Sequence, residues 1–336
     1  MEQEELITIK KSVKSFGFYD VKINPTLDLF YEIEKLKKEK NAVLLAHYYQ
    51  DSDIQDIADF IGDSLKLAQV AKQTKADIIL FAGVHFMAET AKILNPTKKV
   101  ILPDLNAGCS LSESCPEDIF KKFKEKNSDH KIISYINCSA GIKALSDVIC
   151  TSSNAKAIIE SFPKEQKLIF APDRNLGAYL NKTTGREMLL WNGACLVHEN
   201  FNLEKITKTK EQNKSAKTIA HPECEEAILR IADFVGSTSA LLKFTKTDEA
   251  EEFIVVTEAG IIHQMEIESP KKRFIPAPTN NNCACNNCPH MKLNTLEKIY
   301  LCLKYEQPEI ILDEKLRADA ETPILKMLEI SKGVGL

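Results

Sequence analysis

The sequence has neither a long apolar run nor an excess of one charge. No apolar stretch approaches the roughly 18 residues that a membrane-spanning helix needs. The start, MEQEELITIKK, lacks the apolar segment of a signal peptide. Lys and Arg total 44 against 48 Asp and Glu, a net charge of -4, and this balance argues against a nucleic-acid or a membrane partner. We therefore expect a cytoplasmic protein.

The composition excludes disordered chains and fibres, and it singles out cysteine. Charged residues make up 27% and hydrophobic residues 44% of the 336 residues, which is ordinary for a globular protein of two or three units. There is one Trp but there are ten Cys, in a chain too long for a small disulfide scaffold. In a reducing compartment such thiols are buried side chains, metal ligands or nucleophiles.

An internal repeat begins at His47, at Tyr135 and at His221, with steps of 88 and 86 residues. Each copy opens with two polar residues at the end of an apolar run, followed by an Asp and then by a hydroxyl residue. The polar pairs are His47 and Tyr49, Tyr135 and Asn137, and His221 and Glu223; the later positions are Asp59, Asp147, Asp233 and then Ser64, Ser152, Thr238. The period far exceeds that of solenoid repeats, so each copy should form a small domain.

Short apolar runs alternate with helical segments in every copy, which predicts an α/β protein with parallel sheets of about four strands each. In the first copy we expect strands at 42–48, 59–62, 77–84 and 99–104. We place the first α/β unit at residues 1–110, with an N-terminal helix and with C-terminal helices from 289–336 packed back on it. The second and third units would cover 111–198 and 199–288.

Ligands of open parallel sheets bind at the carboxyl ends of the strands. The polar pairs end the first strands, and Ser64, Ser152 and Thr238 should each cap a helix whose N-terminus attracts an anionic group. A cysteine follows each fourth strand: Cys109, Cys195, and one of Cys283, Cys285 or Cys288. Three thiolates from three units suit a [4Fe-4S] cluster, which is normally held by four cysteine ligands. With only three, one iron would stay open as a Lewis acid.

Simpler interpretations exist for some of these residues. His47 could be a buried core histidine and Tyr49 a packed aromatic, and NNCACNNCPH with His290 could form a zinc knuckle. Their shared register in the repeat favours the functional interpretation. The remaining cysteines have no place in that register and should be buried side chains: Cys115, Cys138, Cys150, Cys224 and Cys302.

Several motifs together resemble the quinolinate synthase (NadA) family over roughly residues 40 to 300. They are HYYQ, IADFIGDSL, GVHFMAET, PDLNAGCSL, YINCSA, NGACLVH, HPEC, GSTSAL and CPHMKLNTL, in this order. The resemblance implies three pseudo-threefold-related three-layer α-β-α domains around a [4Fe-4S] cluster held by three cysteines. It also implies condensation of iminoaspartate (iminosuccinate) with dihydroxyacetone phosphate to quinolinate, phosphate and water in NAD biosynthesis. The enzyme that supplies iminoaspartate would be a transient partner.

The resemblance also assigns residues. The metal ligands would be Cys109, Cys195 and Cys288, the last because it precedes the Pro-x-Met stretch. Tyr49, His198 and Glu223 would serve catalysis, and we expect burial to move the pKa of Glu223 toward neutrality. Contacts to substrate would come from His47, Ser64, Tyr135, Ile136, Asn137, Ser152, His221, Pro222, Glu223 and Thr238.

One departure from the family concerns the third cysteine site. Many members carry Cys-x-x-Cys-x-x-Cys there, whereas this chain has Cys283-x-Cys285-x-x-Cys288. The change argues against a redox-active pair described for some members. Two other functions fit an iron-sulfur protein: a hydro-lyase of the aconitase type, and a sensor. The sensor would need an effector surface such as a basic helix, and the charge of -4 counts against it.

Overall fold

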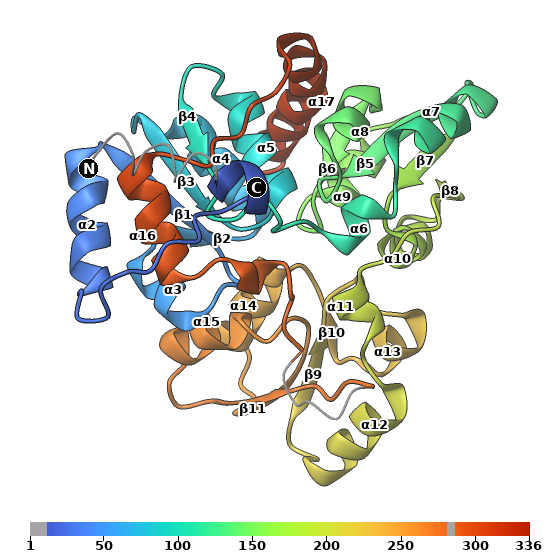
Figure 1. Cartoon of the computed structure of the whole chain (residues 1–336). Helices are drawn as coiled ribbons and strands as arrows, with labels where there is room; N and C mark the ends of the chain where they lie inside the picture. The colour runs from blue at the N-terminus through green and yellow to red at the C-terminus, as the bar shows by residue number, and fades with distance from the viewer. Residues whose placement is uncertain (1–11, 281–285) are drawn as a thin grey trace. The chain divides into compact units, whose positions relative to one another are not determined.

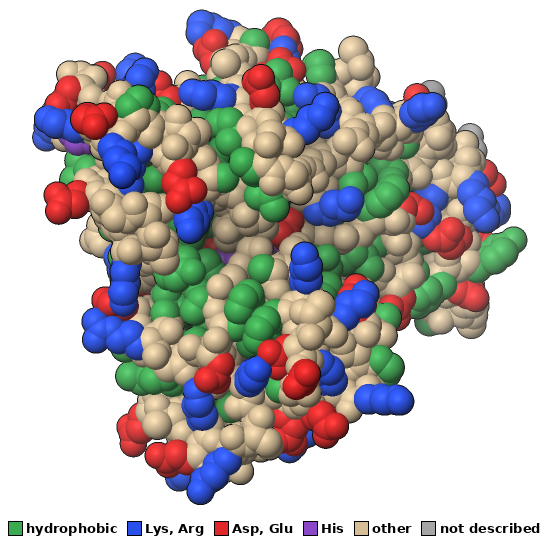
Figure 2. Space-filling view, turned by 180° about the vertical axis from the view of Figure 1, so that it is seen from behind, with side chains coloured by type: hydrophobic (Ala, Val, Ile, Leu, Met, Phe, Trp, Pro, Cys, Tyr) green, Lys and Arg blue, Asp and Glu red, His purple; other side chains and the backbone are tan. Residues whose placement is uncertain are grey.

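The computed structural model describes residues 12–280 and 286–336 (Figure 1). The chain divides into two compact units. The first unit contains the described residues up to Cys109 together with Pro289–Arg317, and the second contains those of Ser110–Cys288 and Ala318–Leu336. Among the described residues, no helix is long and apolar enough to cross a membrane. Figure 2 shows Lys and Arg side chains mixed with Asp and Glu over the face in view.

The first unit is built on one parallel sheet with the strand order β2-β1-β3-β4. Its strands are β1 (Ala42–His47), β2 (Phe60–Gly62), β3 (Ile78–Ala82) and β4 (Lys99–Ile101). Its helical segments are α2 (Leu29–Glu39), α3 (Ser52–Ile57), α4 (Ser64–Gln73), α5 (His85–Leu94), η1 (Met291–Leu293) and α16 (Leu296–Tyr305). α2 and α16 lie side by side (Figure 1), and Ile33 and Ile299 from them pack with Leu44 and Leu80 of the sheet in one core.

The second unit contains two parallel sheets, ordered β6-β5-β7-β8 and β10-β9-β11-β12. The first has β5 (Lys131–Tyr135), β6 (Val148–Cys150), β7 (Leu168–Ala171) and β8 (Leu189–Leu190), and the second has β9 (Lys217–Ala220), β10 (Phe234–Val235), β11 (Glu252–Val256) and β12 (Arg273–Pro276). The helices are α6 (Ser110–Glu113), α7 (Glu117–Lys126), α8 (Ala140–Leu145), α9 (Ala155–Glu160), α10 (Arg174–Thr184), α11 (Leu196–Glu199), α12 (Leu203–Gln212), α13 (Glu226–Ile231), α14 (Thr238–Thr247) and α15 (Ile261–Glu268).

The predicted α/β class is confirmed, since three four-stranded parallel sheets share one strand order. The first strand of each sheet lies between the second and the third, and its residues are almost wholly buried. Sheets buried on both faces require the continuous apolar runs that the sequence shows. The threefold relation of the units and their exact boundaries stay predictions.

The C-terminal segment is divided differently from the expectation for 289–336. Helix α17 (Glu314–Gly333) groups with the first unit as far as Arg317, whose Nη1 donates to Ile93 O at 3.1 Å. From Ala318 the chain groups with the second unit, where Asn154 Nδ2 donates to Ser331 Oγ at 2.9 Å. The grouping of 318–336 thus differs from the expectation for 289–336, which stays a prediction.

The repeated aspartates hold the second strand of each sheet to the first. In every copy the aspartate carboxylate accepts a hydrogen bond from the backbone N–H of one residue in the first strand. The backbone carbonyl of the same residue accepts the N–H of the aspartate. The partners of Asp59, Asp147 and Asp233 are Leu44, Ile132 and Thr218, at 2.7 to 3.0 Å. A lysine contacts each carboxylate as well: Lys37, Lys131 and Lys210. This repeated residue is therefore structural.

Replacing Asp147 should destabilise the second unit. We expect Asp147→Ala to lower the free energy of unfolding by about 1 to 3 kcal/mol, because Ile132 N–H loses its bond beside a buried strand. Urea unfolding measures this change. The matched control is Asp129→Ala, since Asp129 pairs only at the surface with His130 and Lys167 and such pairs contribute at most about 1 kcal/mol. Equal effects of the two variants would contradict the structural role.

Candidate active site

In the second unit, polar side chains meet at the carboxyl ends of β5 and β9. Tyr135 is the last residue of β5, and His221 and Glu223 follow β9 directly. α11 adds His198 to the same place. All four side chains are at most 5% exposed. Two segments of the repeat, 86 residues apart, therefore deliver their polar pairs to one buried site, as the strand-end argument predicts.

The Glu223 carboxylate is the centre of this site. Tyr135 Oη donates to Glu223 Oε1 at 2.5 Å, and His198 Nδ1 lies 2.9 Å from Oε2. His221 Nδ1 is 3.8 Å from Oε1. Both oxygens thus face hydrogen-bond donors or imidazole nitrogens, an arrangement that favours the charged form of a buried carboxyl.

The pKa of Glu223 differs from the expectation. Burial by itself raises the pKa, but His198 and His221, with the hydrogen bonds from His198 and Tyr135, hold it below its ordinary value. Nearby Asp173 behaves in the opposite way, since burial and the charge of Glu223 raise its pKa well above the usual range. The shift of the Glu223 pKa is therefore opposite to the expected one, and the Asp173 pKa shifts in the other direction.

The two buried histidines contact different side chains of the site. Glu223 N–H donates to His221 Nδ1 at 3.3 Å, and His221 Nε2 lies 3.2 Å from Ser152 Oγ. His198 Nδ1 faces the Glu223 carboxylate, and its Nε2 lies 3.0 Å from Thr257 Oγ1. The rings stack with centroids 4.8 Å apart. His221 therefore contacts Ser152, whereas His198 contacts Glu223 and Thr257.

The first unit repeats part of this arrangement. His47 ends β1, and Tyr49 N–H donates to its Nδ1 at 3.2 Å, as Glu223 N–H does to His221. The rings of His47 and Tyr49 meet edge to face with centroids 4.4 Å apart. His47 Nδ1 therefore accepts the same backbone bond as His221 Nδ1. The shared backbone bond shows that the repeat preserves the orientation of this histidine.

The hydroxyl residues of the repeat are not helix caps, contrary to the prediction. Asp63 caps α4 by accepting from Lys66 N, and Ser237 caps α14 by accepting from Ala240 N. Ser64 and Thr238 are the first residues of these helices, and Ser152 lies before Asn154, the N-cap position of the six-residue α9. α4 and α14 begin one position earlier than expected, and α9 begins two positions later, at Ala155, so a neighbouring residue takes each N-cap position. Ser152 bonds instead within the site, to His221.

Three predicted substrate contacts are sequence neighbours of Tyr135, His221 and Glu223. Asn137 is half-buried, and its Oδ1 is buried with no hydrogen-bond partner among the described residues. Ile136 and Pro222 are buried, so they would meet a ligand through their backbone. An orphaned acceptor beside Tyr135 is a site where a ligand N–H or O–H could bond.

The exposure of the described cysteines separates the predicted metal ligands from the cysteines outside the repeat register. Cys109, Cys195 and Cys288 are half-buried, and the other five are buried: Cys115, Cys138, Cys150, Cys224 and Cys302. Burial raises the thiol pKa of Cys115, Cys150, Cys224 and Cys302, which disfavours the thiolate that binds metal. Cys283 and Cys285 lie outside the described residues.

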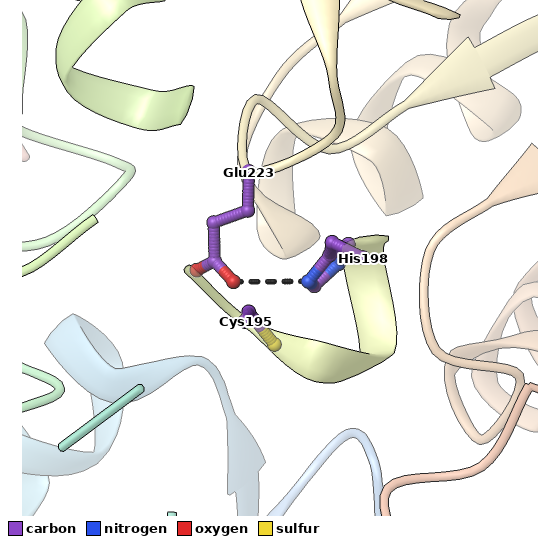
Figure 3. Close-up of side chains that lie close together, drawn as sticks. All are labelled: Cys195, His198 and Glu223. Atoms are coloured by element: carbon purple, nitrogen blue, oxygen red, sulfur yellow. Dashed lines mark ion pairs between the residues drawn. The ribbon is translucent and has the colours of Figure 1, made fainter. Parts of the chain in front are cut away.

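Cys195 lies beside the Glu223 site. Its Sγ, a His198 ring nitrogen and a Glu223 carboxylate oxygen all lie within 4.8 Å of one another. Figure 3 shows His198 and Glu223 pointing toward each other, with Cys195 next to them at the start of α11. One short helix thus carries both a predicted metal ligand and a predicted catalytic residue.

Comparison with known proteins identifies the family. A family model described as "NadA: Quinolinate synthetase A protein" matches residues 31–329. The chain belongs to this quinolinate synthetase A (NadA) family. The quinolinate synthase of Chloroherpeton thalassium is 62% identical over 307 residues, covering 91% of this chain and 95% of that protein. The quinolinate synthase of Nostoc sp. is 63% identical over 305 residues, covering 91% of this chain and 94% of that protein. The quinolinate synthase of Gloeothece citriformis is 61% identical over 312 residues, covering 92% of this chain and 97% of that protein. The chain is therefore an enzyme of this kind.

Three buried polar residues that follow third strands were not predicted from the sequence. Asp173 caps α10 just after β7, and its Oδ2 is buried without a partner among the described residues. Thr257 follows β11 directly and contacts His198. Glu258 comes next and is fully buried. The same strand-end argument that selected His221 would have found them, had it been applied to β7 and β11.

Proposed function

We propose that this enzyme condenses iminoaspartate with dihydroxyacetone phosphate to quinolinate, phosphate and two waters, in the biosynthesis of NAD. The family match over residues 31–329 carries the proposal. The reaction forms one C–C and one C–N bond, and it requires proton removal from carbon, loss of phosphate and two dehydrations. A buried carboxylate surrounded by a tyrosine and two histidines suits such proton transfers.

We further propose that Cys109, Cys195 and Cys288 hold a [4Fe-4S] cluster. These residues fit the group because they are the half-buried cysteines of the described chain, one in each copy of the repeat, whereas the other described cysteines are buried. Thiolates are the usual ligands of such clusters. When bound, a cluster with three protein ligands supplies an open iron as a Lewis acid for an oxygen of the substrate or a leaving water.

The side chains around Glu223 would handle protons. His198, His221 and Tyr135 favour the charged form of Glu223, which would act as the proton acceptor of the site. Tyr135 Oη, 2.5 Å from this carboxylate, would pass or hold that proton. In this proposal His198 keeps the carboxylate oriented through the 2.9 Å contact, and Tyr49 serves as a second acid or base.

The remaining polar groups would bind the two anionic substrates. The Ser152 hydroxyl, which is paired with His221 Nε2, would donate to a carboxylate, and the orphaned Oδ1 of Asn137 is an acceptor for the imine N–H. Further proposed contacts come from the remaining repeat positions: His47, Ser64 and Thr238. The transient partner that supplies iminoaspartate and the cytoplasmic location stay predictions from the sequence.

Product stoichiometry tests the proposed reaction. We expect the anaerobically purified, iron-loaded enzyme to form one quinolinate and one phosphate from each pair of substrates, measured by mass spectrometry and a phosphate assay. Omission of either substrate is the control. Dehydration of a hydroxy acid without any quinolinate would contradict the proposal and support a hydro-lyase of the aconitase type.

A further inference from the structure

We propose that Glu258 and Asn286 are positioning residues that fix the segments of Cys288 and Cys195 for the iron-sulfur cluster. This inference rests on the proposed function, because it concerns two of the three proposed ligands. Neither residue belongs to the repeat that selected the ligands. Both act through hydrogen bonds to the backbone beside a ligand.

Glu258 holds the backbone of Cys288. Cys288 N–H donates to Glu258 Oε1 at 3.0 Å, and Gly260 N–H donates to Oε2 at 2.7 Å. The residue is fully buried. A carboxylate that accepts two N–H bonds in a buried place forms strong, directional contacts. Glu258 therefore fixes where the Cys288 main chain lies relative to the end of β11.

Asn286 joins the Cys288 segment to the helix that follows Cys195. Its Nδ2 donates to Val197 O at 2.7 Å, and its backbone oxygen accepts from Ala259 N at 3.1 Å. Its side chain is 5% exposed. One buried residue thus bonds both to α11, which begins just after Cys195, and to the chain that follows β11. Loss of its amide would leave Val197 O without this bond and free the two segments from each other.

Each residue of the short segment Thr257–Ala259 contacts a different part of the site. Thr257 Oγ1 lies 3.0 Å from His198 Nε2, Glu258 accepts from Cys288, and Ala259 donates to Asn286. The end of β11 therefore sets the positions of a proposed catalytic histidine and a proposed ligand together. Such outer residues orient the groups that bind a metal, and their replacement typically costs about 10- to 100-fold in metal affinity.

The rate of iron release tests this role. We expect Asn286→Ala and Glu258→Gln to lose iron to a ferrous chelator about 10- to 100-fold faster than the wild-type enzyme, under anaerobic conditions. Glu258→Gln keeps the shape of the side chain but can accept only one of the two N–H bonds. If Asn286→Ala does not fold, the iron release from Glu258→Gln alone tests the positioning role.

The matched control is Asn154→Ala. Asn154 is a buried asparagine that bonds Thr151 and Ser331, outside the ligand-bearing segments. It should lower the melting temperature without changing the rate of iron release. Release at the wild-type rate from Glu258→Gln, or equally fast release from Asn154→Ala, would overturn the positioning role. A wild-type chain that binds no iron would instead refute the proposed cluster.

Discussion

Glu223→Gln should abolish most of the turnover while the enzyme keeps its fold and its iron. Glu223 accepts the Tyr135 hydroxyl and faces His198 Nδ1, so its charge is the centre of the buried site. The amide has nearly the same shape but cannot take up a proton at neutral pH. Loss of a general acid or base typically costs about 10²- to 10⁴-fold in rate, and we expect a fall in kcat of this size.

Steady-state quinolinate formation and the iron content of the same preparations measure this effect. The matched control is Glu226→Gln, because Glu226 is exposed and pairs with Arg230 on the surface of α13. It should keep both kcat and iron at the wild-type values. Full activity of Glu223→Gln would remove Glu223 from the chemistry, whereas loss of iron would assign it to cluster binding instead.

The sequence predicted the architecture well because the repeat constrains it three times. The expected strands 42–48, 59–62, 77–84 and 99–104 each contain a strand of the structure, and all three sheets share one order. Buried parallel strands need continuous apolar runs, which are visible without any tertiary information.

Helix starts were harder to predict, since two residues that favour caps stand side by side. Asp63 precedes Ser64, and Ser237 precedes Thr238, and all three residue types, Asp, Ser and Thr, are good N-caps. The repeat register pointed to the second residue of each pair, whereas the backbone uses the first. The hydroxyl of Ser152 bonds His221, from another copy of the repeat, which a local pattern could not reveal.

The electrostatics of the site depended on contacts between distant parts of the chain. A buried carboxyl taken alone should have a raised pKa. Glu223 has a lowered pKa because His198, from α11, and Tyr135, from another sheet, lie against it. The same limit applies to Asn286 and Glu258, whose contacts to the backbone of other segments leave no sequence signal.

Replacement of the three half-buried cysteines should have the second large effect. We expect Cys109→Ser, Cys195→Ser and Cys288→Ser each to lose most of the bound iron and all measurable turnover, because three thiolates already leave the cluster one ligand short. The matched control is Cys150→Ser, which changes a fully buried thiol of β6. It should lower stability but keep the iron. Circular dichroism of each variant shows whether the fold persists without iron.

The content of iron and sulfide per chain, in anaerobically purified wild type and these four variants, tests the central claim most directly. The account predicts about four iron and four sulfide per chain in the wild type and in Cys150→Ser. It predicts far less in each of Cys109→Ser, Cys195→Ser and Cys288→Ser. Full iron and sulfide in any of these three, or a wild type that makes quinolinate without iron, would contradict it.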